Sequence, residues 1–401
     1  MKILQVNIFA DYGSTGKLVQ SIHNGLLNSG SESIICYGRK KRLNDFHYYK
    51  ITFNLFCKFY KFLSFFTGDP NAFAYLETKY LEYIIKKEKP DIVHLHCLNC
   101  FYSNTYELLR FLKRSKIKVI LTLHAELMYT GSCAHAYECE KWLNGCGSCG
   151  NLREATGSLF FDRTSSAWSK YKNIYDDFKT LKVVAVSEWL YNRALKSPFF
   201  KPEQLTFINN GINSSIYYPR NTALLRKKYE AYKYVALHVN PTFQQPIKGG
   251  KFVLELANMN LNEDIVFLIV GYTGDKVSLP RNVVPIPLVR DENLLAEYYS
   301  MADVTILTSK KETFSLVCAE SLSCGTPIIG FEAGAPEKIS DSRMSEFVEY
   351  ANINALNQAL QKWKDFKRNI TDKNLFSELT KKYSSDRMVD EYLALYKQEA
   401  L

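Results

Sequence analysis

The stretch VTILTSKKETFSLVCAESLSCGTPIIGF (304–331) contains three short segments of different pattern. Two apolar runs, at 304–309 and 326–331, have the length and the β-branched residues of buried strands. Between them, SLVCAESLS (315–323) has the composition of a helix. A strand, a helix and a second strand in this order form a crossover that joins two parallel strands. The stretch therefore predicts an α/β fold with a parallel sheet.

Similar apolar runs occur along the rest of the chain, and most end in polar or glycine-rich residues. We expect further strands at 2–9, 32–38, 91–96, 118–124, 181–187, 234–239, 264–271 and 283–289. Asn210-Gly211 and Pro219 mark a hinge between two groups of strands. The predicted domains are residues 1–205 and 206–380, followed by an amphipathic helix within 381–401.

Composition limits the class of protein. A chain of 401 residues suits two domains of about 150–200 residues, and 46% apolar with 23% charged residues is typical of a folded protein. We find no apolar run long enough for a transmembrane helix, and the N-terminus has the pattern of a strand rather than a signal peptide. We therefore expect a cytosolic protein, in which thiols stay reduced.

The formal net charge of +10 favours anionic partners such as nucleotide phosphates, nucleic acid or an anionic membrane. The lysines are dispersed, which argues against nucleic acid. Residues 53–66, FNLFCKFYKFLSFF, are strongly aromatic and include Lys58 and Lys61. Two interpretations stay open for this segment: a helix packed on the first sheet, or a contact with a membrane surface or a lipid acceptor.

Glu312 and Glu320 are separated by seven residues. If 315–323 is a helix, Glu312 precedes it and Glu320 lies about two turns inside. Residues 313–316 would then present free backbone N–H groups, which form an anion site at a helix start. Taken alone, two glutamates at this spacing more often belong to a solvated face.

Several motifs, in order, resemble the retaining glycosyltransferases of family 4. KKETFSLVCAESLSCGTPIIGFEAGAPE (310–337) is similar to the E-x7-E segment of that family, and KGGKFVLELA (248–257) resembles its donor-phosphate loop. GSTGK (13–17) resembles its glycine-rich turn, and VILTLH (119–124) an acceptor-domain strand end. The resemblance spans nearly the whole chain.

This resemblance implies the GT-B fold, which has two Rossmann-like domains with parallel sheets facing across a cleft and a C-terminal helix crossing back to the N-terminal domain. It implies transfer of a hexose from a nucleotide-sugar, by default a UDP-sugar, with retention at the anomeric carbon. The acceptor would be a glycan or a polyprenyl-linked sugar in capsule or lipopolysaccharide synthesis. The enzyme would be cytoplasmic and peripheral at the inner face of the plasma membrane, in contact with anionic lipid and not with nucleic acid.

The resemblance also implies roles for donor-side residues. Glu320 would hold the ribose hydroxyls, Glu312 would lie beside the donor sugar, and Lys248 would offset the diphosphate charge as the glycosidic bond breaks. The backbone amides near sugar and phosphate would be those of Phe314, Ser315, Leu316 and Val317.

In the first domain, Gly13 and Gly16 would let the backbone approach the diphosphate. His124 would contact the donor sugar or orient the acceptor hydroxyl. His94 and His96 alternate on one predicted strand, so we expect them to face opposite sides of the sheet and not to share a metal ion.

Two departures from the family pattern stand out. Phe243 occupies the position of the usual phosphate-binding Arg, and Ser315 that of a frequent Gly. D-x-D, which holds a divalent cation in metal-dependent glycosyltransferases, does not occur in the sequence. We therefore expect chemistry without a metal cofactor.

The segment YTGSCAHAYECEKWLNGCGSCG (129–150) contains Cys133, Cys139, Cys146 and Cys149. The ligand number and compactness suit a structural zinc ion, but reduced thiols and disulfides remain open. A bacterial polysaccharide subgroup of the family is similar here, and the loop would lie on the acceptor side.

Three alternative functions remain. The charge and the cysteines fit a zinc-containing nucleic-acid-binding protein. A Rossmann dehydrogenase is disfavoured because G-x-G-x-x-G does not follow the first strand. A catalytically inactive sugar-nucleotide-binding relative is the third, because the phosphate-binding Arg is missing.

Overall fold

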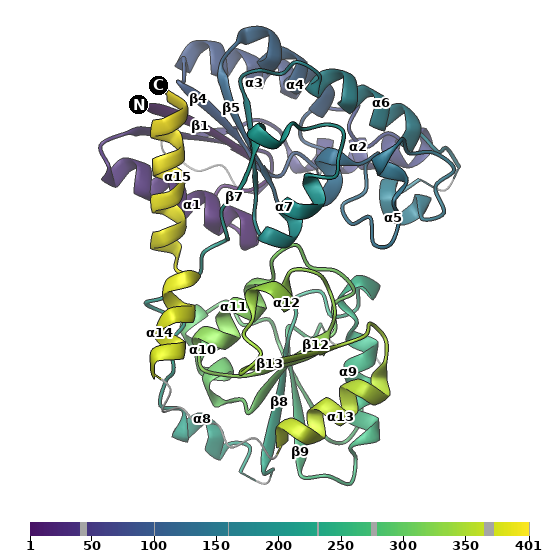
Figure 1. Ribbon diagram of the computed structural model, residues 1–401, viewed down its shortest axis with the longest axis vertical. Helices are drawn as coiled ribbons and strands as arrows, with labels where there is room; N and C mark the ends of the chain where they lie inside the picture. Colours follow the sequence, from purple (N-terminus) through teal and green to yellow (C-terminus); the bar gives the residue numbers. More distant parts are fainter. Residues whose placement is uncertain are drawn as a thin grey trace. The chain divides into compact units, whose positions relative to one another are not determined.

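The chain forms two compact units in a computed structural model, which describes residues 1–40, 46–99, 101–158, 160–230, 232–273, 279–364 and 373–400 (Figure 1). The first unit comprises residues 1–209 and 388–401, and the second comprises 210–387. Each unit contains one parallel sheet with helices on its faces, so the α/β prediction is confirmed for both.

The first unit contains a seven-stranded sheet of order β3-β2-β1-β4-β5-β6-β7 in which every pairing is parallel. Its strands are β1 (Lys2–Asn7), β2 (Glu32–Tyr37), β3 (Tyr48–Lys50), β4 (Ile92–Leu95), β5 (Lys118–Leu123), β6 (Leu181–Ala185) and β7 (Leu205–Phe207). Its α-helices are α1 (Gly13–Asn28), α2 (Asn54–Thr67), α3 (Tyr75–Glu88), α4 (Thr105–Ser115), α5 (Leu152–Thr156), α6 (Thr164–Tyr175), α7 (Glu188–Ala194) and α15 (Ser385–Ala400), which begins in the second unit. Three short 3-10 helices are η1 (Glu126–Tyr129), η2 (Lys141–Leu143) and η3 (Pro202–Gln204).

The second unit contains a six-stranded parallel sheet of order β10-β9-β8-β11-β12-β13. The strands are β8 (Tyr234–Val239), β9 (Ile265–Val270), β10 (Val283–Ile286), β11 (Val304–Leu307), β12 (Ile328–Phe331) and β13 (Ser345–Val348). The helices are α8 (Ala223–Lys227), η4 (Pro246–Lys248), α9 (Gly250–Met259), α10 (Glu292–Met301), α11 (Leu316–Ser323), α12 (Pro336–Ile339), α13 (Ile353–Lys364) and α14 (Lys373–Lys382).

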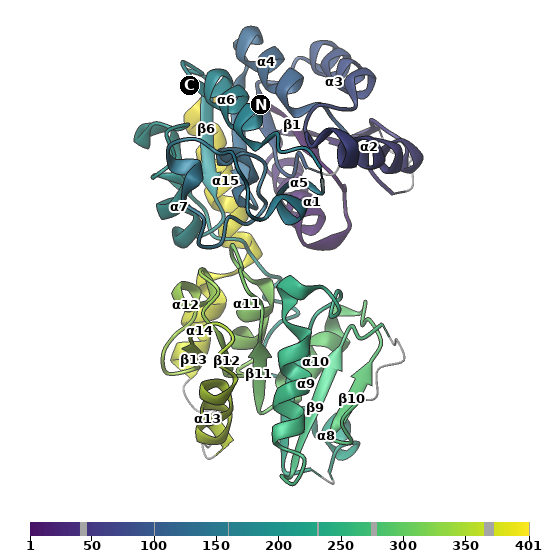
Figure 2. The ribbon, with the colours of Figure 1, turned by 90° about the vertical axis from the view of Figure 1, so that its right-hand side faces the viewer.

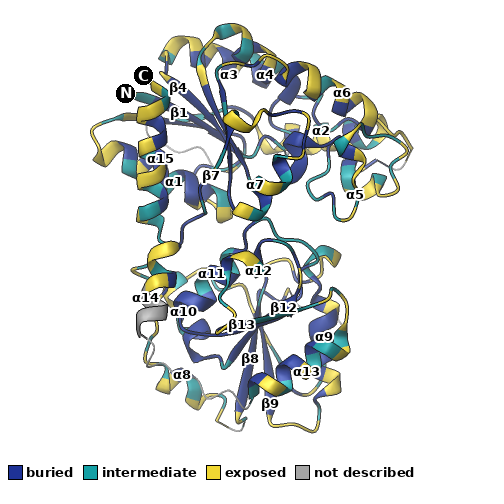
Figure 3. Cartoon of the chain, in the orientation of Figure 1, coloured by how far each residue is buried: buried dark blue, intermediate teal, exposed yellow. Residues whose placement is uncertain are grey.

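Each sheet reverses its strand order at one point, between β1 and β4 in the first unit and between β8 and β11 in the second. Helices that follow neighbouring strands at such a point run to opposite faces, which leaves a crevice beyond the carboxyl ends of those strands. Figure 3 shows the strands of both sheets as largely buried, as expected for parallel sheets covered on both faces. The loops after β1, β4, β8 and β11 are therefore where the topology places ligands.

The C-terminal helix α15 packs on the first unit, which confirms the helix predicted to cross back. Its buried face, with Met388, Tyr392 and Tyr396, forms one core cluster with Ile3 of β1 and Ile22 of α1. Figure 1 shows α15 as the last yellow helix alongside α1. The end of the chain is thus part of the first hydrophobic core.

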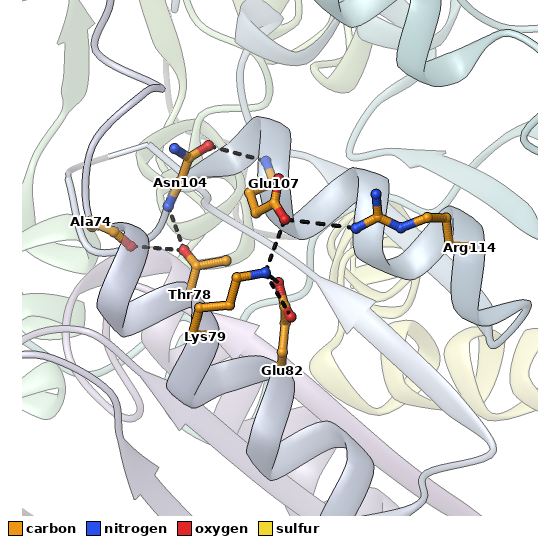
Figure 4. A network of polar contacts seen from close by, with 7 residues as sticks. All are labelled: Ala74, Thr78, Lys79, Glu82, Asn104, Glu107 and Arg114. Carbon is orange, nitrogen blue, oxygen red and sulfur yellow. Dashed lines mark hydrogen bonds and ion pairs between the residues drawn. The ribbon is translucent and has the colours of Figure 1, made fainter.

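A polar network ties α3 to α4 on the first unit (Figure 4). The Lys79 ammonium lies 2.8 Å from a carboxylate oxygen of Glu82 and 2.9 Å from one of Glu107. Asn104 accepts a hydrogen bond from the backbone N–H of Glu107, which caps the start of α4. Its own backbone N–H donates to the Thr78 hydroxyl. The network therefore fixes α3 against α4.

The element boundaries differ from prediction mainly at sheet edges. The strands β3, β7 and β13 were not predicted; all three are short and lie at an edge of their sheets. The helix α1 begins at Gly13, within the stretch 13–17 that was expected to form a glycine-rich turn. Gly13 and Gly16 thus belong to the first turn of the helix and not to a preceding loop.

Candidate functional site

In the second unit, the loops that follow β8 and β11 bring Lys248 and Glu312 together. The Lys248 ammonium lies 2.8 Å from a Glu312 carboxylate oxygen, and both side chains remain partly exposed. Glu312 is fixed by its backbone, because its N–H donates to Ala333 O and its carbonyl accepts from the Ala335 N–H. These are the two loops at the point where the strand order reverses. Two predicted site residues, 64 positions apart, therefore form one pair.

The position of Lys248 depends on the glycine that follows it. Gly249 has a φ of 67°, and a Cβ there would lie 2.0 Å from the carbonyl oxygen of Thr308, which follows β11. The Thr308 hydroxyl in turn donates to the Lys248 carbonyl at 3.1 Å. Only glycine allows this approach, and it holds the turn containing Lys248 against the loop that leads to Glu312.

The start of α11 presents the predicted backbone amides. Ser315 is the N-cap, and its hydroxyl accepts from the Cys318 N–H at 3.3 Å. Phe314 is buried and packs edge-on against Tyr383. Leu316 and Val317 begin the helix and are partly exposed. The side chain of Phe314 therefore serves the core, so that any ligand role of this residue belongs to its backbone.

Glu320 lies in the second turn of α11, slightly nearer the helix start than expected. The Tyr299 hydroxyl donates to one of its carboxylate oxygens at 2.9 Å. Burial raises the pKa of both Tyr217 and Tyr299, and the negative charge of the nearby Glu320 raises it further. Two neutral tyrosine hydroxyls thus orient this carboxylate. Sequence reasoning missed both tyrosines, since a buried tyrosine carries no motif of its own.

Phe243 belongs to the hydrophobic core of the second unit. Its ring packs edge-on against His238 at 5.6 Å and against Tyr272 at 5.5 Å between ring centroids. A charged side chain at this place would lose its hydration without a partner. The position where the family usually has an Arg is therefore part of the hydrophobic core in this chain.

In the first unit, the start of α1 follows β1 directly. Gly13 has a φ of 71°, and a Cβ on Gly16 would lie 3.2–3.3 Å from atoms of Asp11 and Phe9. No side chain caps this helix end, and its first turn contains no acidic residue. The end of α1 thus has the exposed N–H groups and the positive dipole end that favour an anion.

His124 follows β5, is half-buried, and lies at the outer end of a chain of polar groups that continues into the core. Its Nε2 lies 3.2 Å from His96 Nδ1, and His96 Nε2 lies 3.3 Å from Gln5 Oε1. Since the Gln5 side-chain nitrogen lies 3.5 Å from the Val19 carbonyl oxygen, its Oε1 is the acceptor toward His96. His96 then carries its proton on Nε2, and His124 donates from its own Nε2. Burial lowers the pKa of His124 to about 4, so the ring is neutral at pH 7.

The expectation that His94 and His96 face opposite sides of the sheet was wrong. Residues two apart on a strand point to the same face, and the two rings lie 3.9 Å apart between centroids. His94 is engaged with Tyr396 of α15 at 2.5 Å and with Thr122 of β5 at 2.7 Å. It therefore connects the C-terminal helix to the strand that leads to His124.

The chain matches known glycosyltransferases along most of its length. Residues 16–216 match the family Glycosyltransferase Family 4, and residues 234–364 match the family Glycosyl transferases group 1. The chain belongs to glycosyltransferase family 4. This membership favours a sugar-transferring enzyme over the nucleic-acid-binding and dehydrogenase interpretations.

Two curated relatives of this glycosyltransferase are similar at low identity. A putative colanic acid biosynthesis glycosyl transferase, WcaC of Escherichia coli, is 22% identical over 78% of this chain and 78% of its own length. The N-acetyl-alpha-D-glucosaminyl L-malate synthase of Bacillus anthracis is 28% identical over 53% of this chain and 58% of its own length.

Solved structures of other glycosyltransferases share the fold. A sucrose-phosphate synthase of Thermosynechococcus elongatus has a TM-score of 0.71 at 17% identity, covering 99% of this chain and 98% of that chain. HepE of Anabaena, in complex with UDP, has a TM-score of 0.69 at 13% identity, covering 99% and 100%. The predicted GT-B fold class, with two Rossmann-like domains, is confirmed.

The cysteine-rich loop of the glycosyltransferase gathers its four cysteines around one pocket of about 260 Å³. The loop is anchored by Trp142, which is buried and donates to the Cys139 carbonyl, and by the Cys149 N–H, which donates to Asp162. Among the described residues all cysteines are free thiols, and no three His, Cys, Asp or Glu side chains are arranged to hold a metal ion. The disulfide interpretation is not supported, and zinc stays a prediction.

The described residues contain no helix that is both long enough and apolar enough to cross a membrane. The aromatic segment at 53–66 forms the greater part of α2, most of whose aromatic rings are exposed. The first interpretation of this segment, a helix packed on the sheet, therefore does not explain why these rings are exposed.

Proposed function

We propose that this family 4 enzyme transfers a sugar from a nucleotide-sugar, by default a UDP-sugar, to a glycan or lipid-linked acceptor, with retention at the anomeric carbon. The observation that carries the proposal is the Lys248–Glu312 pair at 2.8 Å, beside the start of α11 in the second unit. A cationic group, exposed amides and a carboxylate are what a diphosphate with an attached sugar requires.

The relatives support the proposed substrates. WcaC is named for colanic acid biosynthesis, and HepE is seen with UDP and with UDP-glucose. We propose a role in building a surface polysaccharide. A lipid-linked acceptor lies at a membrane, so the proposal implies a peripheral enzyme at the cytoplasmic face of the plasma membrane.

In the proposed reaction, Lys248 leaves Glu312 to pair with the diphosphate of the donor. When the bond from the anomeric carbon to phosphate oxygen breaks, its electron pair stays on the phosphate, and the ammonium and the amides at the start of α11 stabilise the new charge. The acceptor oxygen forms its bond on the same face of the sugar, and its proton passes to the departing phosphate. Glu320, held by its two tyrosines, binds the ribose hydroxyls. This scheme needs no metal ion.

In the first unit, we propose that His124 contacts the donor sugar or the acceptor hydroxyl as a neutral hydrogen-bonding group. A ring with a pKa of about 4 supplies no positive charge at pH 7, so its role would be orientation and not charge stabilisation. Gly13 and Gly16 would keep the start of α1 open to an anionic group.

The test is a panel of UDP-, GDP- and ADP-sugars, scored by thermal stabilisation and by slow hydrolysis in the presence of EDTA. We expect one donor to stabilise the wild type, and we expect Lys248→Ala to lower turnover by about a hundredfold or more. Glu312→Ala should lose turnover as well. Leu294→Ala, an exposed position on α10, is the matched control. Wild-type behaviour of both site variants would overturn the site assignment.

A second candidate function is a relative that binds sugar nucleotides without transferring the sugar. The burial of Phe243 where the family has a phosphate-binding Arg favours it. Thermal stabilisation by a donor, without hydrolysis or transfer to any acceptor, would be its signature.

A further inference from the structure

The helix α2 (Asn54–Thr67) is packed on the protein by its polar side. Its fully buried residues are Cys57 and Ser64. Between them, the Tyr60 hydroxyl donates to the buried Glu77 carboxylate of α3 at 3.0 Å, and the Tyr60 ring stacks on Phe73. A helix on the surface of a soluble domain normally buries its apolar stripe and exposes its polar side. Here the arrangement is reversed.

The outward face of α2 is a continuous apolar stripe. Leu55, Phe59, Phe62 and Phe66 are spaced by four, three and four residues, so they lie on one side of the helix. Their exposed fractions are 73%, 53%, 60% and 46%. Phe56, with 46% exposed, borders the stripe. Single exposed hydrophobic residues are ordinary, whereas a stripe of large ones over three turns marks an interaction surface.

The stripe continues onto a second segment of the first unit. Phe160, in the chain between α5 and α6, is 67% exposed, and its ring meets that of Phe65 at right angles with centroids 6.0 Å apart. Phe161 beside it is 51% exposed. Figure 2 shows α2 at the periphery of the first unit. Two segments about a hundred residues apart therefore contribute to one apolar surface.

The charged side chains of α2 itself are all lysines. Asn54–Thr67 contains no Asp or Glu, and its exposed Lys58 and Lys61 flank the apolar stripe. At the start of the helix, the Lys50 ammonium lies 5.6 Å from the centre of the Phe53 ring. Lysine stems can lie along apolar surface while their ammonium groups reach toward phosphate. The surface thus combines apolar insertion with attraction to anions.

We propose that α2 with Phe160 and Phe161 is the surface by which this protein docks on an anionic lipid bilayer. The helix lies parallel to the membrane, with Phe59, Phe62 and Phe66 between headgroups and acyl chains and the lysines at the lipid phosphates. A second copy of the chain fits this surface less well than a bilayer does. Two α2 helices placed face to face would bring their lysines together, and α2 offers no carboxylate to pair with them. The inference rests on the first unit alone and does not depend on the donor or acceptor proposed above.

The test is co-sedimentation of the full chain with vesicles of phosphatidylcholine, with and without phosphatidylglycerol. We expect binding to the anionic vesicles that weakens with salt. The double variant Phe59→Ser/Phe62→Ser should lower the partition coefficient by about tenfold or more, since both rings leave the bilayer. Lys58→Ala and Lys61→Ala should each lower it by about fivefold, and only on anionic vesicles. Leu224→Ser is the matched control, because Leu224 is 87% exposed on α8 of the second unit.

A second readout reports insertion directly. In Phe62→Trp, the new indole should shift to shorter emission wavelength on anionic vesicles and be quenched by lipids brominated along the acyl chain. Donor-induced thermal stabilisation should be unchanged in every α2 variant, which separates this inference from the proposed function. Equal binding by wild type and the double serine variant would overturn the proposal. So would a dimer in solution that the serine variant dissociates, if the wild type leaves vesicles unbound.

Discussion

Ser315, at the start of α11, has a backbone conformation with a positive φ, which is unusual for a residue other than glycine. The family often has Gly at this position, and Ser315 adopts a φ of 80° and a ψ of 90°, a region that only glycine enters without strain. A residue other than glycine in such a conformation costs about 1–3 kcal/mol. The serine hydroxyl offsets part of this cost by capping the Cys318 N–H. The residue is therefore a compromise between backbone strain and capping.

We predict that Ser315→Gly stabilises the second unit by about 1 kcal/mol, because relief of strain exceeds the lost cap and the added chain entropy. Ser315→Ala should destabilise it by about 1 kcal/mol, because it keeps the strain and loses the cap. Equilibrium unfolding in urea measures both variants. A glycine variant less stable than the alanine variant would contradict this account. Donor binding should survive in the glycine variant, since the backbone amides keep their places.

The loop between η1 and α6 is held by a few anchors. Trp168 donates from its indole N–H to the carbonyl of Trp142, and Trp142 packs edge-on against Tyr129 of η1. Both contacts hold Trp142, which lines the cysteine pocket. A metal ion bound by the four thiolates would add to the order that these contacts give the loop.

We predict about one zinc ion per chain in protein purified without an affinity tag. Cys146→Ser should lose the metal and lower the melting temperature of the first unit, whereas Cys97→Ser, outside the pocket, should do neither. Elemental analysis measures the zinc content per chain, and thiol titration measures how many of the four cysteines react. Zinc far below one per chain, with all four thiols reactive, would remove the metal from consideration.

The sequence predicted those features of the two units that depend on local pattern. The strand β8 was predicted with its observed bounds, and the helix expected at 315–323 is α11, which begins one residue later. What it could not predict depends on contacts between distant positions. The pairing of Lys248 with Glu312 arises from strand order, and the burial of Phe243 from the core around it. The ring contact of His94 with His96 follows from strand geometry, because residues two apart on a strand share a face.

The buried histidines give the two units different responses to acid. Burial lowers the pKa of His94, His96 and His124 in the first unit, and that of His238 in the second. A depressed pKa in the folded state means that the unfolded chain binds protons first as the pH falls below about 6.5. Stability contributed by these neutral rings is therefore present at pH 7 and is lost progressively toward pH 4. Down to about pH 5 the carboxylates stay ionised, so the histidines dominate the change.

We predict that the first unit loses stability about three times as steeply as the second between pH 6.5 and pH 5, because each such histidine contributes at most about 1.4 kcal/mol per pH unit. Calorimetry at pH 7, 6 and 5 should show one transition moving down more than the other. His94→Gln should flatten the steeper response and His238→Gln the shallower one. Equal slopes for the two transitions, or a wild-type slope in His94→Gln, would show that these rings are protonated in the folded protein. In that case the neutral state assigned to His124, and with it the uncharged hydrogen-bonding role proposed for this ring, would be wrong.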